Sequence, residues 1–402
     1  MNNDPVFPPE LFAVIIGALA DDLKTLRSCA LVSSTFYGLA RVFSHLQVGP
    51  RLDGEHDFPQ FCALLEGSPP FAARVESLRI CVKWDPGEPN PRKWILEADL
   101  GRCFSLLVSL TRLCITVDSG SLSWLTLSHA NRNSIQAILP ILTCLELKNV
   151  ILLPPALLSH CSLLRSLTLD DVIFDDSSGA AADTDNCNSS IHLRYLVLRL
   201  RAIVLIQFVD WVTNPESLFD FSCLHSLEYT TNHPSNQFPI QRLLNASSPS
   251  LQRLRIQKIL LLSTVADEVK LDLRQLAHLR TLALDIYLND WEAYNHERLL
   301  SLRNFVFPPP QQQLALVLDV FTEEEPRRTD IMQRLADVDH VVARLPFETV
   351  TVIVWAWSPE NGRKDKLIDV CDQFVPAMPL LASKPGRTDR LRILESITGT
   401  HA

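Results

Sequence analysis

The amino-acid sequence predicts an α/β fold, in which a short N-terminal segment of three helices precedes an irregular solenoid built on a parallel β-sheet. Three observations favour it: helical apolar spacing near the N-terminus, a leucine phrase that recurs eight times, and two nearly continuous β-branched runs after it. The predicted domains are a helical domain (1–46), a linker (47–72) and a repeat domain with an atypical strand–helix–strand end (73–402).

The N-terminal domain begins with prolines that suit a first helical turn, whose N–H groups have no helical partner. Asp21-Asp22 can cap a second helix, and Ser33 or Ser34 can cap a third. The apolar positions of the three predicted helices form one stripe each: Leu11, Ile15, Ile16 and Leu19, then Leu23, Leu26 and Ala30, then Phe36, Leu39 and Phe43. So small a unit buries little surface by itself, so a partner is expected to cover its apolar stripe.

These residues resemble the F-box, whose pattern opens with Leu-Pro-x-Glu-Leu, continues with an Ile-x-x-Leu helix and an acidic break, and closes with Val-Cys/Ser-x-x-Trp. The chain has Phe7-Pro8-x-Glu10-Leu11 at the opening and Leu31-Val32-Ser33 before Phe36 at the close. Phe7 replaces the usual leucine and Phe36 the usual tryptophan, and both keep an apolar anchor. The alternative is a helical cap that shields the end of the next domain.

The resemblance implies that this domain docks on the Skp adaptor and, through it, on a cullin ubiquitin ligase. The implied contacts are Pro8, Leu11, Ile15, Ile16, Leu19, Leu26, Val32 and Phe36.

Composition excludes several classes of protein. With 47% hydrophobic and 21% charged residues, most of the 402 residues are expected to be globular. A net charge of −9 without a Lys- or Arg-rich run gives no footprint for nucleic acid. The N-terminus lacks a basic segment, and apolar stretches such as 13–20 are too short to span a membrane. We therefore expect a soluble protein of the cytoplasm, the nucleus or both.

The ten cysteines form no Cys-x-x-Cys pair, and most lie within leucine-rich segments. Reduced cysteine is a small apolar residue that is often buried. We therefore expect thiols, with no metal and no cofactor.

The recurring phrase is apolar-x-x-Leu-x-apolar. Its eight occurrences begin at Val75, Leu110, Leu142, Leu164, Leu193, Leu224, Leu251 and Leu279. The last two positions of the phrase lie two residues apart, so both face one side of a short strand. Helix-compatible pieces lie between strands, at Ser134 to Leu139, Pro155 to Cys161, Ile240 to Asn245 and Leu273 to Leu276. No single repeat can bury its apolar face, so stacking is expected to place the strands in one parallel sheet. The pattern resembles degenerate leucine-rich repeats, and Asn149 loosely matches the asparagine that usually follows their strand.

Two insertions and the C-terminal third break this pattern. Trp84 to Asp99 is expected to be a loop, and Asp170 to Ser190 a solvated insertion in preference to a calcium loop, because the EF-hand ligand order is missing. Leu314 to Val320 and Thr349 to Trp357 are predicted strands. The predicted helices of this third are Asp330 to Leu345, Leu367 to Phe374 and Thr388 to Ile397.

The sequence contains no phosphate-binding glycine loop, no Gly-x-Ser-x-Gly elbow and no His-Glu-x-x-His motif. We therefore do not expect this protein to be an enzyme. Residues that alternate with the buried leucines should face a binding surface, and they are Arg79, Arg112, Glu146, Lys148, Thr168, Tyr195, Arg199, Glu228, Arg253 and Arg255. The preferred substrate-binding candidates are Tyr195, Arg199, Glu228, Arg253 and Arg255, because Arg and Tyr are frequent interface hot spots. They could equally be ordinary solvated strand residues.

The resemblances together imply a substrate-recognition adaptor of a Skp–cullin–F-box ubiquitin ligase whose repeats bind a protein substrate. The alternative is a non-catalytic leucine-rich-repeat scaffold outside any ubiquitin ligase.

Overall fold

Parallel strands form most of the described chain, and each of the eight leucine phrases supplies one of them. The computed structural model describes residues 57–82, 98–118, 120–175, 190–230, 237–257 and 271–287, the shorter stretches 46–48, 95–96, 305–306, 315–322, 349–356 and 391–396, and the single residues Leu11, Thr25 and Ser28. The chain divides into two units, Met1–Ile191 and His192–Ala402. The fold is mixed α/β with a parallel sheet.

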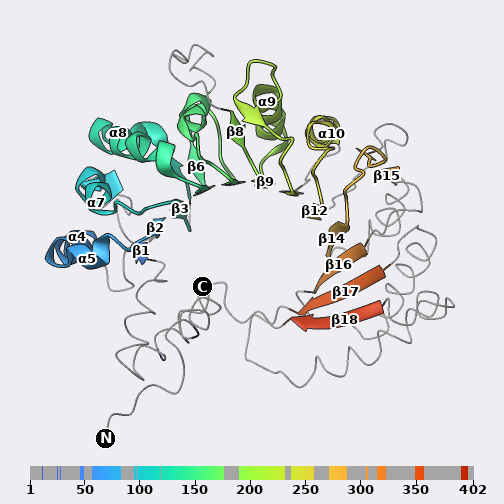
Figure 1. Ribbon diagram of the computed structural model, residues 1–402, viewed down its shortest axis with the longest axis horizontal. Coiled ribbons are helices and arrows are strands. Elements are labelled where there is room, and N and C mark those ends of the chain that lie inside the picture. Colours follow the sequence, from blue (N-terminus) through green and yellow to red (C-terminus); the bar gives the residue numbers. More distant parts are fainter. Residues whose placement is uncertain are drawn as a thin grey trace, which may run out of the picture. The chain divides into compact units, whose positions relative to one another are not determined.

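In the first unit, five strands pair in the order β1-β2-β3-β5-β7. Their bounds are β1 (Leu46–Val48), β2 (Ser77–Val82), β3 (Arg112–Val117), β5 (Cys144–Lys148) and β7 (Ser166–Asp170). A two-stranded sheet joins β4 (Leu122–Ser123) to β6 (Val150–Ile151). The helices are α4 (Asp57–Gly67), α5 (Pro69–Ala72), α7 (Leu100–Leu106), α8 (His129–Ile138) and the 3₁₀ helices η1 (Trp124–Thr126), η2 (Leu139–Ile141) and η3 (Pro155–His160). Figure 1 shows α7 and α8 on one side of β2 and β3.

In the second unit, seven strands pair in the order β9-β11-β12-β14-β16-β17-β18. Their bounds are β9 (Tyr195–Arg199), β11 (Ser226–Thr230), β12 (Arg253–Gln257), β14 (Thr281–Tyr287), β16 (Ala315–Thr322), β17 (Thr349–Ala356) and β18 (Leu391–Ser396). Short pairs join β8 (Ile191–His192) to β10 (Phe219–Asp220), and β13 (Leu271–Asp272) to β15 (Phe305–Val306). Helices α9 (Ala202–Val212) and α10 (Gln237–Ala246) lie on one side of β9 and β12 (Figure 1).

Each position of the leucine phrase has its own structural role. The first apolar residue closes the turn before the strand, because its N–H donates to the carbonyl three residues earlier, as for Leu110, Leu142 and Leu224. The second and third apolar residues are strand positions whose side chains are buried, such as Leu227 and Tyr229 on β11. Intervening residues, such as Glu228, are less buried and lie on the other face of the strand. The phrase therefore encodes a turn followed by a one-sided strand.

A repeating backbone contact sets the spacing between successive strands. The carbonyl of the residue before each strand accepts two N–H groups from the next repeat, at 2.8–3.1 Å. The accepting residues are Glu76, Thr111, Thr143, Arg194, His225 and Gln252. Because the contact uses backbone atoms alone, it tolerates the irregular sequence between the phrases.

Side chains of the intervening segments join neighbouring repeats. In the first unit, buried Asn131 of α8 accepts from the N–H of Leu100 and donates to the carbonyl of Ile95, both at 3.2 Å. After β5, Asn149 adopts a left-handed φ of 57° and donates through Nδ2 to the carbonyl of Val117 at the end of β3. Asparagine suits this position because its short polar side chain tolerates left-handed backbone.

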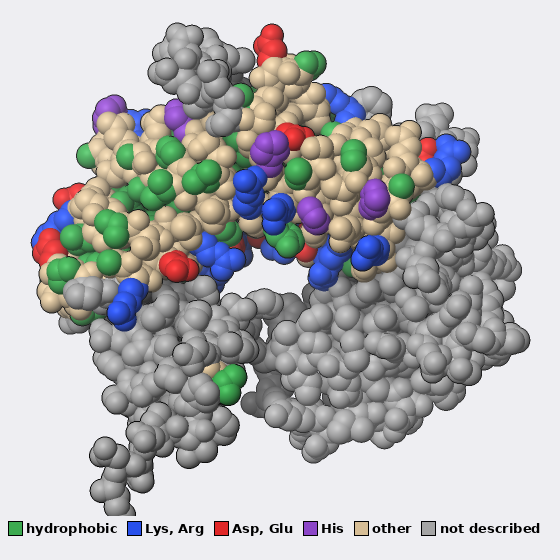
Figure 2. Space-filling model, viewed as in Figure 1, with side chains coloured by type: hydrophobic (Ala, Val, Ile, Leu, Met, Phe, Trp, Pro, Cys, Tyr) green, Lys and Arg blue, Asp and Glu red, His purple; other side chains and the backbone are tan. Residues whose placement is uncertain are grey.

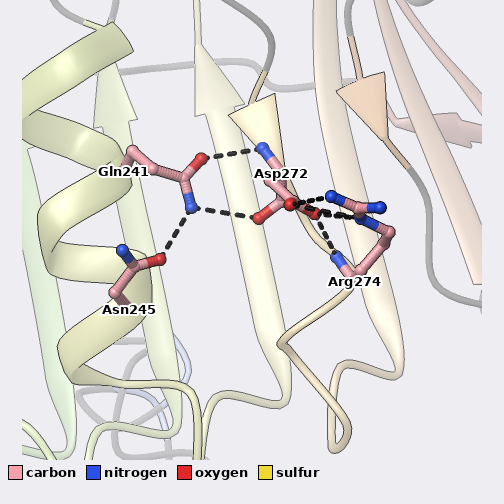
Figure 3. A network of polar contacts seen from close by, with 4 residues as sticks. All are labelled: Gln241, Asn245, Asp272 and Arg274. Atoms are coloured by element: carbon pink, nitrogen blue, oxygen red, sulfur yellow. Dashed lines mark hydrogen bonds and ion pairs between the residues drawn. The ribbon is translucent and has the colours of Figure 1, made fainter.

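Figure 3 shows the corresponding network of the second unit. The Gln241 amide of α10 accepts from the N–H of Asp272 (2.7 Å) and donates to the Asp272 carbonyl (3.0 Å) and to Asn245 Oδ1 (2.8 Å). The Asp272 carboxylate accepts from the backbone N–H and the guanidinium of Arg274. One side chain thus satisfies both backbone groups of a β13 residue, which fixes α10 against the next repeat.

Most of the sequence-based elements are confirmed where the structure describes them. All eight phrases form strands, as do the two β-branched runs, and helices lie at three of the four expected linking segments. Helix α4 lies within the stretch 47–72 that was assigned to the linker.

Two predictions are wrong. Leu273 to Leu276 forms turns, because it joins β13 to Leu279 with too few residues for a helix, and Leu276 and Leu279 each close a three-residue turn. Within the segment Thr388 to Ile397, residues Leu391–Ser396 form strand β18 and not a helix, since they satisfy the open edge of β17 by parallel pairing. The predicted helices at 330–345 and 367–374 lie outside the described residues, as do 84–94 and 97 of the first insertion and 176–189 of the second.

The core lies between the strands and the intervening helices. Helix α9 buries Val204, Leu205 and Phe208, and it was not predicted from the sequence. Next to it, aromatic rings pack in series from Phe208 through Trp211 and Phe219 to Phe221, with centroids 5.3–6.2 Å apart. Tyr229 replaces a leucine in this core, and burial raises the pKa of its hydroxyl.

Candidate binding surface on the sheet

The non-core face of the sheet carries polar side chains in register across neighbouring strands. Because paired strands are parallel and aligned, equivalent residues of successive repeats lie side by side in rows. Neighbouring residues of one row are about 4.8 Å apart, the distance between paired strands. In the second unit one row runs Tyr195, Ser226, Arg253 and Thr281, and the next runs Val197, Glu228, Arg255 and Ala283. Four of the five predicted substrate-binding residues thus lie in two adjacent rows, and Arg199 ends β9 beside them.

Glu228 is the centre of a polar cluster on this face. Arg199 Nη2 donates to Glu228 Oε1 at 2.7 Å, and Gln257 Nε2 donates to the same oxygen at 2.8 Å. Arg199 Nε donates in turn to Gln257 Oε1 at 3.0 Å. Arg255 approaches from the other side, with its Nε 4.0 Å from Glu228 Oε2. We call Arg199, Glu228, Arg255 and Gln257 the Glu228 cluster.

The Glu228 cluster has a net charge of +1, because one carboxylate faces two guanidinium groups. Glu228 and Arg255 are largely buried, with side chains 18% and 20% exposed, whereas Arg199 is 40% exposed. Hydrogen bonds to charged groups are stronger than neutral ones, so the cluster holds these side chains in a defined arrangement. A fixed arginine loses less conformational entropy on binding than a free one.

Tyr195 and Arg253 flank the cluster in the adjacent row. Both pair in register with Ser226, so they lie two strands apart, about 10 Å, with only a small side chain between them. Tyr195 is 54% exposed, which is unusual for a large aromatic residue on a sheet. The sheet therefore presents an aromatic ring and a guanidinium to solvent on either side of a serine.

Basic residues dominate the exposed charges near these strands. The exposed arginines of the second unit adjoining β9, β12 and β14 are Arg194, Arg199, Arg201, Arg253 and Arg280. Figure 2 shows Lys and Arg side chains near the places where these strands lie in Figure 1. Locally, the surface is basic although the whole chain carries −9.

The first unit has a smaller polar row on β2, β3 and β5. Arg79, Cys114 and Glu146 lie in register. Burial and, to a smaller extent, the Glu146 charge raise the pKa of the Cys114 thiol to about 12, although Arg79 opposes both. The thiol therefore stays protonated at neutral pH, and it fills space beside an arginine and a carboxylate. Three more of the predicted surface residues lie on the same face of these strands and of β7. Arg112 is in register with Cys144, Lys148 with Thr116, and Thr168 with Glu146.

The predicted Skp-binding residues are placed by the structure at one position only. Leu11 is helical and 47% exposed. The others lie outside the described residues: Pro8, Ile15, Ile16, Leu19, Leu26, Val32 and Phe36.

Sequence reasoning missed Gln257 and Thr230, although both belong to the same surface. Thr230 Oγ1 donates to Gln257 Oε1 at 3.2 Å, which helps to orient the amide between Arg199 and Glu228. Gln257 lies two residues after Arg255, so strand alternation already places it on the exposed face. Strand alternation could therefore have placed Gln257 on this surface, but a neutral amide was not among the residue types chosen as binding candidates.

The described residues contain one group that superficially resembles catalytic machinery. His192 Nδ1 lies 2.8 Å from Asp220 Oδ2, and Ser222 Oγ donates to the same oxygen at 2.9 Å. Because the serine donates to the carboxylate and not to the imidazole, it lacks the adjacent base that a nucleophilic serine needs. The group instead orders the turn after β10, where Asp220 also accepts from the Ser222 N–H.

Among the described residues, no cluster of three or more His, Cys, Asp or Glu side chains has a geometry that could hold a metal ion. None of their helices combines the length and the apolar character needed to cross a membrane.

No protein-family model matches the chain, and no curated protein is detectably similar to it in sequence.

Proposed function

We propose that the chain is a substrate-binding adaptor of a Skp–cullin–F-box ubiquitin ligase. Residues 1–46 would bind the Skp adaptor, and the sheet face of the second unit would bind a protein substrate. The single observation that carries the proposal is the series of parallel strands formed by the eight leucine phrases, which is the arrangement that leucine-rich repeats require. The Asn149 contact with Val117 supports the same repeat class.

The sheet face favours a substrate with an acidic segment. Its exposed charges are mainly arginines, and Tyr195 adds an aromatic anchor beside them. Arginine binds carboxylates through two parallel hydrogen bonds, and complementary charge accelerates encounter. In the Glu228 cluster, an incoming carboxylate would share the guanidinium groups of Arg199 and Arg255.

The adaptor performs no bond chemistry in this proposal. It holds the substrate near the ubiquitin-conjugating enzyme, which raises the effective concentration of the target lysine. This role requires two separate surfaces on one chain, and the residues assigned to them lie far apart in sequence: 8–36 for the adaptor and 195–257 for the substrate.

Binding to the purified Skp adaptor tests the proposal. The double variant Leu11→Asp/Ile16→Asp should lose binding while its circular dichroism spectrum stays that of the wild type. The matched control is Leu64→Asp/Leu125→Asp, because Leu64 and Leu125 are exposed leucines outside the F-box-like segment, and it should bind normally. A wild-type chain that does not bind the Skp adaptor would overturn the proposal.

A second candidate, a repeat scaffold outside any ligase, rests on the sheet face alone. The two described rows of that face lie between Tyr195 and Ala283, so partner binding there needs no Skp contact. Ubiquitination of a protein that co-purifies with the chain separates the two candidates. If the N-terminal helices are only a cap, Leu19→Asp or Phe36→Asp would unfold the chain instead of abolishing a partner.

A further inference from the structure

A hollow of about 270 Å³ lies in the helical layer of the first unit, between η1, α8 and η3. This is separate from the polar face of the sheet, since its lining residues belong to the helices and their flanking turns. One part of its wall is apolar and is formed by Trp124, Pro154 and Leu157. The volume equals that of about nine water molecules, which is enough for a small organic molecule or one large side chain.

The other lining residues include hydrogen-bonding groups whose roles follow from their contacts. His160 Nδ1 lies 3.1 Å from the carbonyl of Ala156, so this nitrogen must carry the proton and donate. Its Nε2 then accepts from the Gln136 amide at 3.3 Å. Both ring nitrogens of His160 therefore have hydrogen-bond partners within the protein. Its side chain lines the hollow but does not offer a group to bind a ligand.

His129 has the opposite arrangement. Its Nδ1 lies 3.1 Å from Asn133 Nδ2, and an amide nitrogen can only donate, so Nδ1 is the acceptor. The proton of the neutral ring is then on Nε2. The imidazole therefore offers an N–H donor in addition to the bond it already makes.

Arg132 carries a permanent positive charge in the same wall. Its Nε is buried and has no hydrogen-bond partner among the described residues. The residues that line the hollow include no aspartate or glutamate to balance the guanidinium. A buried donor without a partner is costly, so such a group calls for a ligand or a water molecule.

We propose that this hollow binds a small organic anion with an apolar body and one phosphate or carboxylate group. Arg132 and the Nε2–H of His129 hold the anionic group, and the body lies against Trp124 and Leu157. A guanidinium binds either group through paired hydrogen bonds, which is why the two head groups share one site. The proposal does not depend on the F-box-like segment or on the sheet face.

Isothermal titration calorimetry of the full chain with phenyl phosphate, benzoate and neutral phenol tests this proposal. We expect saturable binding of at least one anion with a Kd at or below about 1 mM, and at least tenfold weaker binding of phenol. Binding of phenyl phosphate alone assigns the site to phosphate esters, and binding of benzoate as well extends it to carboxylates. Equal binding of phenol and both anions, or no saturable anion binding, overturns the proposal.

Variants locate the binding in the hollow. Arg132→Gln should weaken anion binding at least tenfold, whereas Arg74→Gln, which removes an exposed arginine outside the lining, should leave it unchanged. Arg132→Lys keeps the charge but not the paired hydrogen bonds, and it should fall between the wild type and Arg132→Gln. Ring ¹⁵N shifts in nuclear magnetic resonance spectra supply a local reading, because the anion should move the signal of His129 and not that of His278. Equal affinity of the Arg132→Gln and Arg74→Gln proteins would contradict the assignment.

Discussion

At the scale of single residues, the polar groups of this chain are arranged so that charges hold each other in place. Glu228 of β11 is linked to β9 through Arg199 and to β12 through Arg255, and the neutral Gln257 contacts both Arg199 and Glu228. The Asp272–Arg274 pair does the same within one turn (Figure 3). These contacts position side chains more than they stabilise the fold, because partly exposed ion pairs contribute about 1 kcal/mol or less.

Asp272 gives a pH-dependent prediction at this scale. The Arg274 guanidinium holds the pKa of the Asp272 carboxyl below its usual range, and the Arg274 backbone N–H adds to this effect. A carboxyl with a lowered folded-state pKa stabilises the fold above the unfolded pKa, about 3.9, and this contribution is lost as pH falls through the folded pKa. Asp272→Asn should therefore lower the free energy of unfolding at pH 7 by at most about 1 kcal/mol.

Denaturant unfolding of the wild type and Asp272→Asn at pH 7 and pH 2.5 checks this prediction. The difference between the two proteins should shrink at the lower pH. At pH 7 the difference should also shrink in 1 M salt, since Arg274 is 63% exposed and the pair is open to screening. A difference that stays constant across pH would contradict the assignment of this contribution to the charge of the Asp272 carboxylate.

Which candidate residues share a face could be predicted from the sequence, because strand alternation is a local rule. Tyr195, Arg199, Glu228, Arg253 and Arg255 all lie on the exposed side as expected. Which of them touch could not be predicted, because contact depends on the register between β9, β11 and β12. Similarly, the hollow that Arg132 lines is formed by residues of both α8 and η3, and no local sequence pattern predicts that these two segments lie together.

At the scale of elements, the leucine phrase could be read as a strand because three buried positions and a turn are specified within six residues. Helix α9 could not be recognised in the same way. Its sequence from Ala202 to Val212 is almost continuously apolar and rich in β-branched residues, so periodicity does not distinguish a buried helix from a buried strand. Strand β18 was mistaken for a helix because its pairing with β17 is a long-range contact.

Because only one face of each strand is buried, substitutions at adjacent residues of β12 should change the free energy of unfolding by very different amounts. Leu254 is fully buried and lies in register between Leu227 and Leu282, so Leu254→Ala should leave a cavity and cost about 2–5 kcal/mol. Arg253, one residue earlier, is exposed, so Arg253→Ala should change the free energy of unfolding by less than about 0.5 kcal/mol. Urea denaturation followed by circular dichroism measures both. Comparable losses would mean that the two faces of β12 are equally packed.

At the scale of the whole molecule, the repeats make stability and recognition largely separable. Each strand pairs only with its neighbours in the sheet order, so the apolar face supplies stability at every step. The exposed face can then vary in sequence without loss of fold. This explains how an irregular set of repeats, with spacings from 22 to 35 residues between phrases, still carries polar side chains in register across β9, β11 and β12.

Separable surfaces lead to a prediction about the proposed adaptor as a whole. Tyr195→Ala/Arg253→Ala should remove an aromatic and a cationic contact from the substrate face without disturbing the core, so it should lose substrate capture and keep Skp binding. Leu11→Asp/Ile16→Asp should do the reverse. Proximity labelling in cells, with each variant fused to the same labelling enzyme, compares the two sets of neighbours. The Skp adaptor should disappear from one set and a distinct group of acidic proteins from the other, because the two surfaces bind independently. If either variant lost both sets while remaining folded, the two surfaces would be coupled and the chain would not be a simple two-surface adaptor.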